Sequence, residues 1–313
     1  MLSRRVFLAN SAAGTVALAA NTSAFGLKSD TRSGVTFSFG TYGMKSLPAE
    51  RAVQAIADIG FDGVELAALP DWDSHPANLP PSRRQELRTV IRSSGLQLTA
   101  LSHNNRPTDD DAEHIRDLDR LKRVIELGQE LSPAEHPLIQ GIFGGGQWQE
   151  QKGMFAKRMA DWAELAERER TVICIKPHRG SAMSRPSEAV WLIRQLGDTP
   201  WLRMVYDYSH YAFREMSIET TVQAALEHTG HIAVKDSIRQ GNGTTFVLPG
   251  ESGGFDYKTL FRLFYTGGYR GDISCEVSSA VWSKPGYDPL AAARTCYKNI
   301  APILELAGVP RRR

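Results

Sequence analysis

Residues 171–180, with the sequence TVICIKPHRG, decide the fold of this chain. Their β-branched and apolar side chains are typical of a buried strand, and Pro177 ends that strand because proline cannot donate to the ladder. Three later stretches, 204–207, 231–236 and 272–276, also carry apolar runs that end in a charged side chain. We therefore expect these four strand ends to gather polar groups at one edge of a parallel sheet.

The whole chain alternates between patterns typical of strands and of amphipathic helices. The predicted strands lie at residues 35–41, 61–66, 96–102, 137–143, 172–176, 204–207, 232–234 and 273–277. The predicted helices lie at residues 48–59, 81–94, 111–130, 148–168, 186–196, 218–228, 257–264 and 289–306. Eight such units predict a single α/β domain, a (β/α)8 TIM barrel over residues 34–308, since one barrel needs about 250 residues. A doubly wound sheet is less consistent with the pattern, because no G-x-G-x-x-G follows the first strand.

The first 26 residues have the features of an export signal. Arg4 and Arg5 precede a small, apolar run at residues 9–24, and an A-x-A-like cleavage site lies at 17–19. The run is too short and too rich in Ala, Ser, Thr and Asn to be a stable membrane anchor, which needs about 20 apolar residues. We expect residues 1–26 to be a twin-arginine signal peptide and the protein to be periplasmic or secreted; a retained tail is the alternative.

Charge and cysteine content limit the partners and the redox chemistry. The chain has 37 Lys and Arg residues against 35 Asp and Glu residues, and two of the arginines lie in the signal segment. A domain with balanced charge is poorly matched to nucleic acid. Cys174, Cys275 and Cys296 cannot all pair, and the first two lie in predicted core strands, where cysteine acts as a small hydrophobe. No structural disulfide is expected.

Five motifs resemble the xylose isomerase-like superfamily of sugar isomerases and epimerases. They are GFDGVE at 60–65, YDYSH at 206–210, VKD at 234–236, LPGESGGFD at 248–256 and GGYRGDISCE at 267–276. Each is weak alone, but together they occur in order at barrel spacing and cover nearly the whole chain after the signal. The resemblance implies proton transfer beside a carbonyl group of a small carbohydrate.

The resemblance also implies a divalent metal (Mn, Mg or Zn) held by glutamate, aspartate, histidine and glutamate on strands five to eight. Asp207 and Glu276 match two of these positions, whereas Lys176 and Ala233 replace the other two. His231, two residues before Ala233, is a tentative substitute ligand. A protonated lysine is a poor ligand, and its ammonium could itself offset the two carboxylates. Both an atypical metal site and a site without an ion therefore remain open.

Roles can be assigned to further residues near the strand ends. We predict that Lys176, Glu276 and His210 are catalytic, with the lysine acting as base, acid or Schiff-base nucleophile. The residues predicted to bind substrate are His103, His178, Arg179, Glu65 and Trp282. Each has a structural alternative in a loop, a salt bridge or the core. Tyr42 and Trp148 lie on strand-end loops, where sugars often stack on aromatic rings.

The leading interpretation is an exported sugar isomerase or epimerase with an atypical metal site. A lyase acting on a keto sugar would use the same proton abstraction. A non-catalytic periplasmic carbohydrate-binding protein is the alternative favoured by the replacements at Lys176 and Ala233. An apurinic-site nuclease is disfavoured because it needs a multi-zinc cluster and a basic groove. The expected partner is a small carbohydrate, and the sequence leaves open whether the chain forms a homo-oligomer.

Overall fold

The predicted strands form a closed barrel in the structure, a computed structural model that describes residues 33–104, 106–241 and 243–312. The strands run parallel in the order β1-β10-β7-β6-β5-β4-β3-β2, which confirms the predicted TIM barrel. Their bounds are β1 Thr36–Gly40, β2 Gly63–Ala67, β3 Gln97–Ser102, β4 Leu138–Ile142, β5 Ile173–Lys176, β6 Leu202–Tyr206, β7 Thr229–Val234 and β10 Asp272–Cys275. The predicted export signal at residues 1–26 lies outside the described residues.

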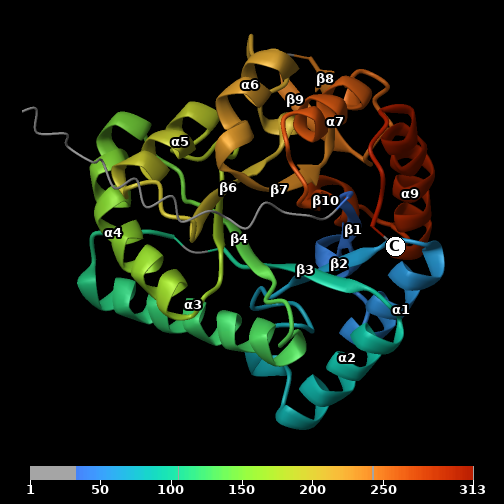
Figure 1. The fold of residues 1–313 in the computed structure, drawn as a ribbon, viewed down its shortest axis with the longest axis horizontal. Helices are drawn as coiled ribbons and strands as arrows, with labels where there is room; N and C mark the ends of the chain where they lie inside the picture. The colour runs from blue at the N-terminus through green and yellow to red at the C-terminus, as the bar shows by residue number, and fades with distance from the viewer. Residues whose placement is uncertain (1–32, 105, 242, 313) are drawn as a thin grey trace, which may run out of the picture. The chain divides into compact units, whose positions relative to one another are not determined.

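Helices connect successive strands and lie around the outside of the barrel (Figure 1). Their bounds are α1 Ala49–Ile59, α2 Pro81–Ser93, α3 Asp111–Leu131, α4 Trp148–Arg168, α5 Pro186–Gln195, α6 Ile218–Ala225, α7 Tyr257–Thr266 and α9 Pro289–Leu306. Each begins and ends within three residues of its predicted position. The prediction succeeded because each helix has its own apolar stripe and local boundary signals.

Helix α1 shows how the sequence sets these elements. Its buried residues Ala49, Ala52, Val53 and Ile56 fall at helical spacing and form one face against the barrel. Gly60 ends the helix with a φ of 104°, a left-handed conformation that costs glycine little. The side chain of Asp110 accepts a hydrogen bond from the backbone N–H of Glu113 and so caps α3 in the same local manner.

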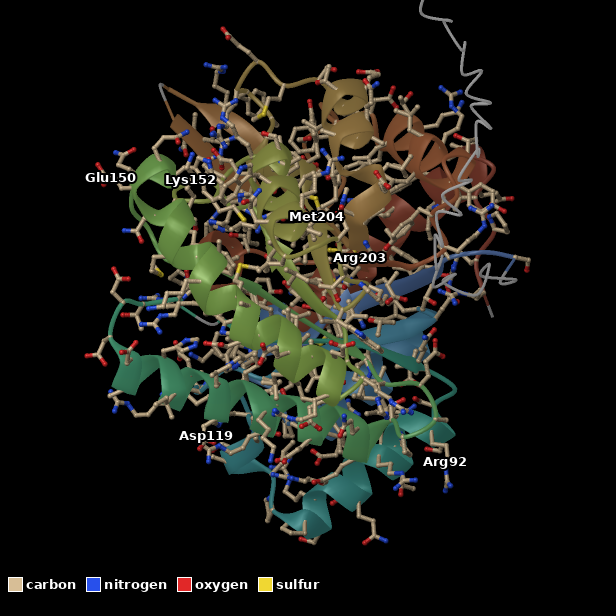
Figure 2. All side chains as sticks on the ribbon, turned by 60° about the vertical axis from the view of Figure 1, so that its left-hand side comes forward. Arg92, Asp119, Glu150, Lys152, Arg203 and Met204 are labelled. Carbon is tan, nitrogen blue, oxygen red and sulfur yellow. The ribbon has the colours of Figure 1, made fainter. Side chains whose placement is uncertain are left out.

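Charged side chains cover the outer faces of the helices. Asp119 on α3 and Glu150 on α4 are exposed and point away from the barrel (Figure 2). In the described part of the chain, no helix combines the length and the apolar character that a membrane span requires.

One hairpin was not predicted. Strands β8 Asp236–Gln240 and β9 Gly243–Val247 pair antiparallel after β7, outside the barrel sheet. A short helix, α8 Ser279–Trp282, follows β10 and was also not predicted. Both lie at the end of the barrel where the parallel strands finish, which is where this fold places its site.

The barrel interior is layered by the two-residue period of its strands. Cys174 on β5, Val205 on β6 and Ala233 on β7 pack together as a small apolar cluster. The inward positions two residues further along are Lys176, Asp207 and Lys235. An apolar layer of the barrel interior is therefore followed directly by a charged layer, two residues further along the strands.

Candidate active site

Four charged side chains form a closed cluster at the ends of β5, β6, β7 and β10. Lys176 Nζ lies 2.9 Å from Asp207 Oδ2 and 2.5 Å from Glu276 Oε2. Lys235 Nζ lies 2.8 Å from Glu276 Oε1 and 3.5 Å from Asp207 Oδ2. Cations and anions alternate, so each lysine contacts both carboxylates. We call these four residues the charge ring.

Asp207 is the more firmly held of the two carboxylates. Its side chain is completely buried, and its Oδ1 accepts hydrogen bonds from the Ser209 backbone N–H at 3.1 Å and the Ser209 hydroxyl at 2.5 Å. His210 Nε2 lies 3.3 Å from Oδ2. Glu276 instead keeps 15% of its side chain exposed, and in the described chain its hydrogen bonds come from the two lysines.

The ring stabilises its charged form. Burial alone would raise the pKa of Asp207 and Glu276, but the ammonium groups, led by Lys176, hold both pKa values well below the usual range. Burial alone would lower the pKa of Lys176, and the two carboxylates raise it above its ordinary value. Lys176 is therefore an ammonium ion near neutral pH, and in this state it can donate hydrogen bonds but cannot act as a base or nucleophile.

Two histidine rings, tilted by 45° to each other, lie beside the charge ring. The His178 and His210 rings are 3.9 Å apart between centroids. The Arg179 backbone N–H donates to His210 Nδ1 at 3.2 Å, so the neutral ring carries its proton on Nε2, the nitrogen next to Asp207. Burial lowers the pKa of His210 well below its usual range and that of His178 to about 4. Both rings are therefore neutral near pH 7.

The residues of the charge ring do not fit a divalent metal ion. An ammonium nitrogen has no free lone pair, and two ammonium groups lie between the carboxylates. Over residues 33–104, 106–241 and 243–312, no group of three or more His, Cys, Asp or Glu side chains is arranged to hold a metal. Asp207, Glu276 and the tentative ligand His231 are thus not gathered into one metal site.

His231 belongs to a separate polar cluster deeper in the barrel. Its Nε2 lies 3.1 Å from Glu65 Oε2, and the Gln140 amide donates to Glu65 Oε1 at 2.9 Å. The polar partners of the Glu65 carboxylate are thus a histidine and a glutamine. Glu65 also lines the pocket described next, so its predicted contact with substrate remains compatible with its position.

A pocket of about 200 Å³ opens above the charge ring. Its lining includes Lys176, Lys235, Glu276 and His178. Hydroxyl and amide groups from neighbouring loops form much of the remaining wall: Tyr42, Ser102, Asn104, Gln140, Ser278 and Ser279. Several hydrogen-bonding groups around a few charges suit a small polyhydroxylated molecule rather than a polymer.

The structure does not bring every predicted binding residue to this pocket. The Arg179 guanidinium contacts the hydroxyl of Thr244 at 3.3 Å and the carbonyl of Ala212, and so ties the β8–β9 hairpin to the loop after β6. His103 lines a much smaller internal cavity. Trp282 packs edge-on against Tyr42, at 5.6 Å between ring centroids.

Two residues of the site were missed by sequence reasoning. Lys235 follows Ala233 by two residues on the same face of its strand, so the two-residue period could have placed it in the ring. The ring centroid of Phe246 on β9 lies 4.9 Å from Lys235 Nζ, and Phe246 also lines the pocket. Its only sequence signal was the glycine-containing turn of the hairpin, with Gly241 and Gly243 between the two strands.

Comparison with known proteins agrees with this architecture. Residues 53–299 match the family model described as "Xylose isomerase-like TIM barrel". A Mus musculus protein named "Putative hydroxypyruvate isomerase" is 25% identical over 120 residues. That alignment covers 36% of this chain and 41% of the mouse protein.

Solved structures of similar fold include enzymes acting on sugars. A 3-keto-D-glucoside 4-epimerase from E. coli superposes with a TM-score of 0.66 at 16% identity, covering 87% of this chain and 99% of the other. A xylose isomerase-like TIM barrel protein from Mycobacterium smegmatis, solved in complex with magnesium, has a TM-score of 0.66 at 18% identity and coverage of 87% and 97%. At these identities the likeness demonstrates the fold.

Proposed function

We propose that this chain, which belongs to the xylose isomerase-like TIM barrel family, is a sugar isomerase or epimerase that moves a proton beside a carbonyl group. The observation that carries the proposal is that one carboxylate of the charge ring faces the pocket. A carboxylate, Glu276, stands between two ammonium groups at the base of a pocket rich in hydroxyl and amide groups. The sugar epimerase among the structural relatives supports the same chemistry.

The residues present can perform the proton transfer as follows. A lysine N–H donates to the substrate carbonyl oxygen, and Glu276 removes the proton from the adjacent carbon. The electron pair of that C–H bond forms the C=C bond of an enolate, and the negative charge that develops on oxygen is stabilised by the ammonium groups. Return of the proton to the former carbonyl carbon, together with transfer of the adjacent hydroxyl proton to the enolate oxygen, moves the carbonyl group and gives the isomer. Protonation of the original carbon on its opposite face gives the epimer.

This scheme requires Glu276 to become more basic when substrate binds. The two lysines hold its pKa low in the free protein. When their N–H groups turn toward a substrate oxygen, that stabilisation of the carboxylate weakens and its pKa rises. His178, a neutral ring in the pocket wall, can relay a proton to the substrate, donating from one ring nitrogen while the other accepts a proton from solvent. His210 contacts His178 and Asp207, so we assign it a positioning role.

The test is exchange of substrate C–H protons with solvent. The purified protein is incubated in D₂O with D-fructose, hydroxypyruvate and a 3-keto-D-glucoside, and deuterium incorporation is followed by NMR. We expect exchange into at least one compound and a loss of roughly 100-fold or more in Glu276→Gln, the range for a general base. The exposed Glu150→Gln is the matched control and should retain the parent rate. Exchange that survives in Glu276→Gln would contradict the assignment.

A non-catalytic carbohydrate-binding protein is the second candidate, and one observation favours it. Both carboxylate oxygens of Glu276 are paired with ammonium groups, a state that is stable but weakly basic. Saturable sugar binding without any exchange would support this candidate and exclude the enzyme. A keto-sugar lyase would exchange the same proton but release an unsaturated product, which the same spectra detect.

We also propose that the protein is exported through a twin-arginine signal. The support is the Arg4–Arg5 pair ahead of a weakly apolar, alanine-rich run. Replacing both arginines by lysine should leave the precursor in the cytoplasm, as judged by cell fractionation and immunoblotting. Equal periplasmic accumulation of the variant and the parent would rule out this route.

A further inference from the structure

We propose that Lys176 and Lys235 form a two-ammonium oxyanion site that receives paired substrate oxygens and takes the place of a bound metal ion. This inference rests on the proposed function for its biological meaning, but it concerns ligand binding and can be tested separately. The ligand class is a small molecule with two adjacent oxygens that share negative charge, such as the enediolate of a hydroxyketone or the carboxylate end of a keto acid.

The position of Glu276 defines where such a ligand would bind. Lys176 donates to its Oε2 at 2.5 Å, and Lys235 donates to its Oε1 at 2.8 Å. The two ammonium groups therefore already hold one planar oxyanion by both oxygens. Glu276 is also the ring carboxylate that faces the pocket, with 15% of its side chain exposed.

The lysines do not depend on Glu276 for their position. Asp207 lies within 2.9 Å of Lys176 and 3.5 Å of Lys235 on the buried side of the ring. It is fixed in turn by the backbone and hydroxyl of Ser209. Phe246 adds a cation–π contact to Lys235. An entering oxyanion can thus displace Glu276 while the lysines stay in place, and this frees the carboxylate for proton transfer.

The two lysines also have enough N–H donors to bind both oxygens of a single ligand. Each ammonium has three N–H groups, of which one donates to Glu276, while Asp207 Oδ2 lies within ion-pair distance of both nitrogens. Even with a second N–H on each lysine facing Asp207, the remaining N–H and the one released by Glu276 provide enough donors for two ligand oxygens. Charge-assisted bonds of this type are the stronger hydrogen bonds in proteins.

Oxalate is a suitable probe because it is a planar dianion with adjacent oxygens. Its binding is measured by isothermal titration calorimetry in EDTA at neutral pH. We expect binding without metal, weakened roughly 10- to 100-fold in Lys235→Met, as for loss of a hydrogen bond to a charged group. Glu276→Gln removes the competing anion and should bind oxalate more tightly, roughly 10-fold. The exposed Lys258→Met is the control and should leave the affinity unchanged.

The opposite directions expected for Lys235→Met and Glu276→Gln separate the proposal from general loss of structure, because a destabilised protein would not gain affinity. Binding that needs added Mn²⁺, or that is unchanged in Lys235→Met, overturns the proposal. Oxalate binding with the expected pattern but no deuterium exchange would support the oxyanion site and refute the proposed function. Deuterium exchange that occurs only with added Mn²⁺ would support the proposed function and refute the metal-free oxyanion site.

Discussion

The β6 and β10 sides of the barrel mouth carry the same chemical group in different settings. On the β6 side, Asp207 is completely buried and receives hydrogen bonds from Ser209 in addition to its lysine partners. On the β10 side, Glu276 has the lysines as its partners and faces the pocket. The comparison separates two tasks: Asp207 anchors the cations, and Glu276 can leave them.

This division explains how the site accommodates a lysine at the position where the family resemblance implied a carboxylate ligand. Two carboxylates at close range repel each other unless a cation lies between them. Here the compensating charge is covalently attached to β5 and to the end of β7, so the cluster is complete without a dissociable group. One carboxylate then becomes available for chemistry.

The largest expected effect follows from removing the anchor. Asp207→Asn leaves two buried ammonium groups with one partly exposed carboxylate, so we expect a loss of roughly 3–5 kcal/mol in the free energy of unfolding. Urea denaturation at pH 7 measures it. A loss below about 1 kcal/mol, the range of a surface pair, would show that Asp207 is not an anchor.

Lys176→Met should have the next largest effect. In the sequence, Lys176 was the one cation expected between the two carboxylates, and loss of a lone buried partner typically costs about 3 kcal/mol. Because Lys235 contacts both carboxylates as well, we now expect a smaller loss, about 2 kcal/mol, in urea denaturation. The double variant Lys176→Met/Lys235→Met should lose more than the sum of the two single changes, since each lysine compensates for the other.

Glu276→Gln should destabilise the protein less, by about 1–2 kcal/mol, because water in the pocket can solvate the lysines on this side. The same change should abolish deuterium exchange. A stability loss as large as that of Asp207→Asn would remove the distinction between anchor and releasable carboxylate. The two variants are best measured side by side, in the same buffer.

The fold was predictable from the sequence because its signals are local. The alternation of apolar strand patterns and amphipathic helix patterns predicted the element order, and the eight units predicted the closed barrel. The sequence predicted one of the two lysines of the charge ring, because Lys176 stands at the end of a predicted strand. Lys235 was overlooked although it lies two residues beyond Ala233 on the same face.

Side-chain direction in loops was the part that the sequence could not provide. Arg179 and His103 both follow barrel strands, yet one binds the hairpin and the other lines a different cavity. Their direction depends on neighbours that are distant in sequence: Thr244 lies 65 positions from Arg179. The hairpin itself is polar and lacks an apolar face of its own, so hydrophobic periodicity did not reveal it.

The smallest expected effect concerns the histidines near Asp207. Their contribution to the free energy of unfolding should be lost at a higher pH than that of the two carboxylates. The pKa of His178 is lowered to about 4 by burial and by the positive lysines, so the folded state favours the neutral ring. A histidine with a lowered pKa contributes stability above its unfolded value of about 6.5, and that contribution is lost as pH falls toward 4. Asp207 and Glu276 have lowered pKa values, so their contribution is present above about pH 4 and is lost only below it.

Mild acid should therefore weaken the histidine side before it affects the carboxylates. In His178→Asn, the fall in unfolding free energy between pH 6.5 and 4 should be smaller than in the parent, by about 1 kcal/mol after allowance for screening at the pocket edge. His210 also has a lowered pKa and remains in the variant, so part of the slope should persist. The exposed His136→Asn should follow the parent profile. Identical profiles for His178→Asn and the parent would mean that the pKa of His178 is not lowered by burial and the lysines.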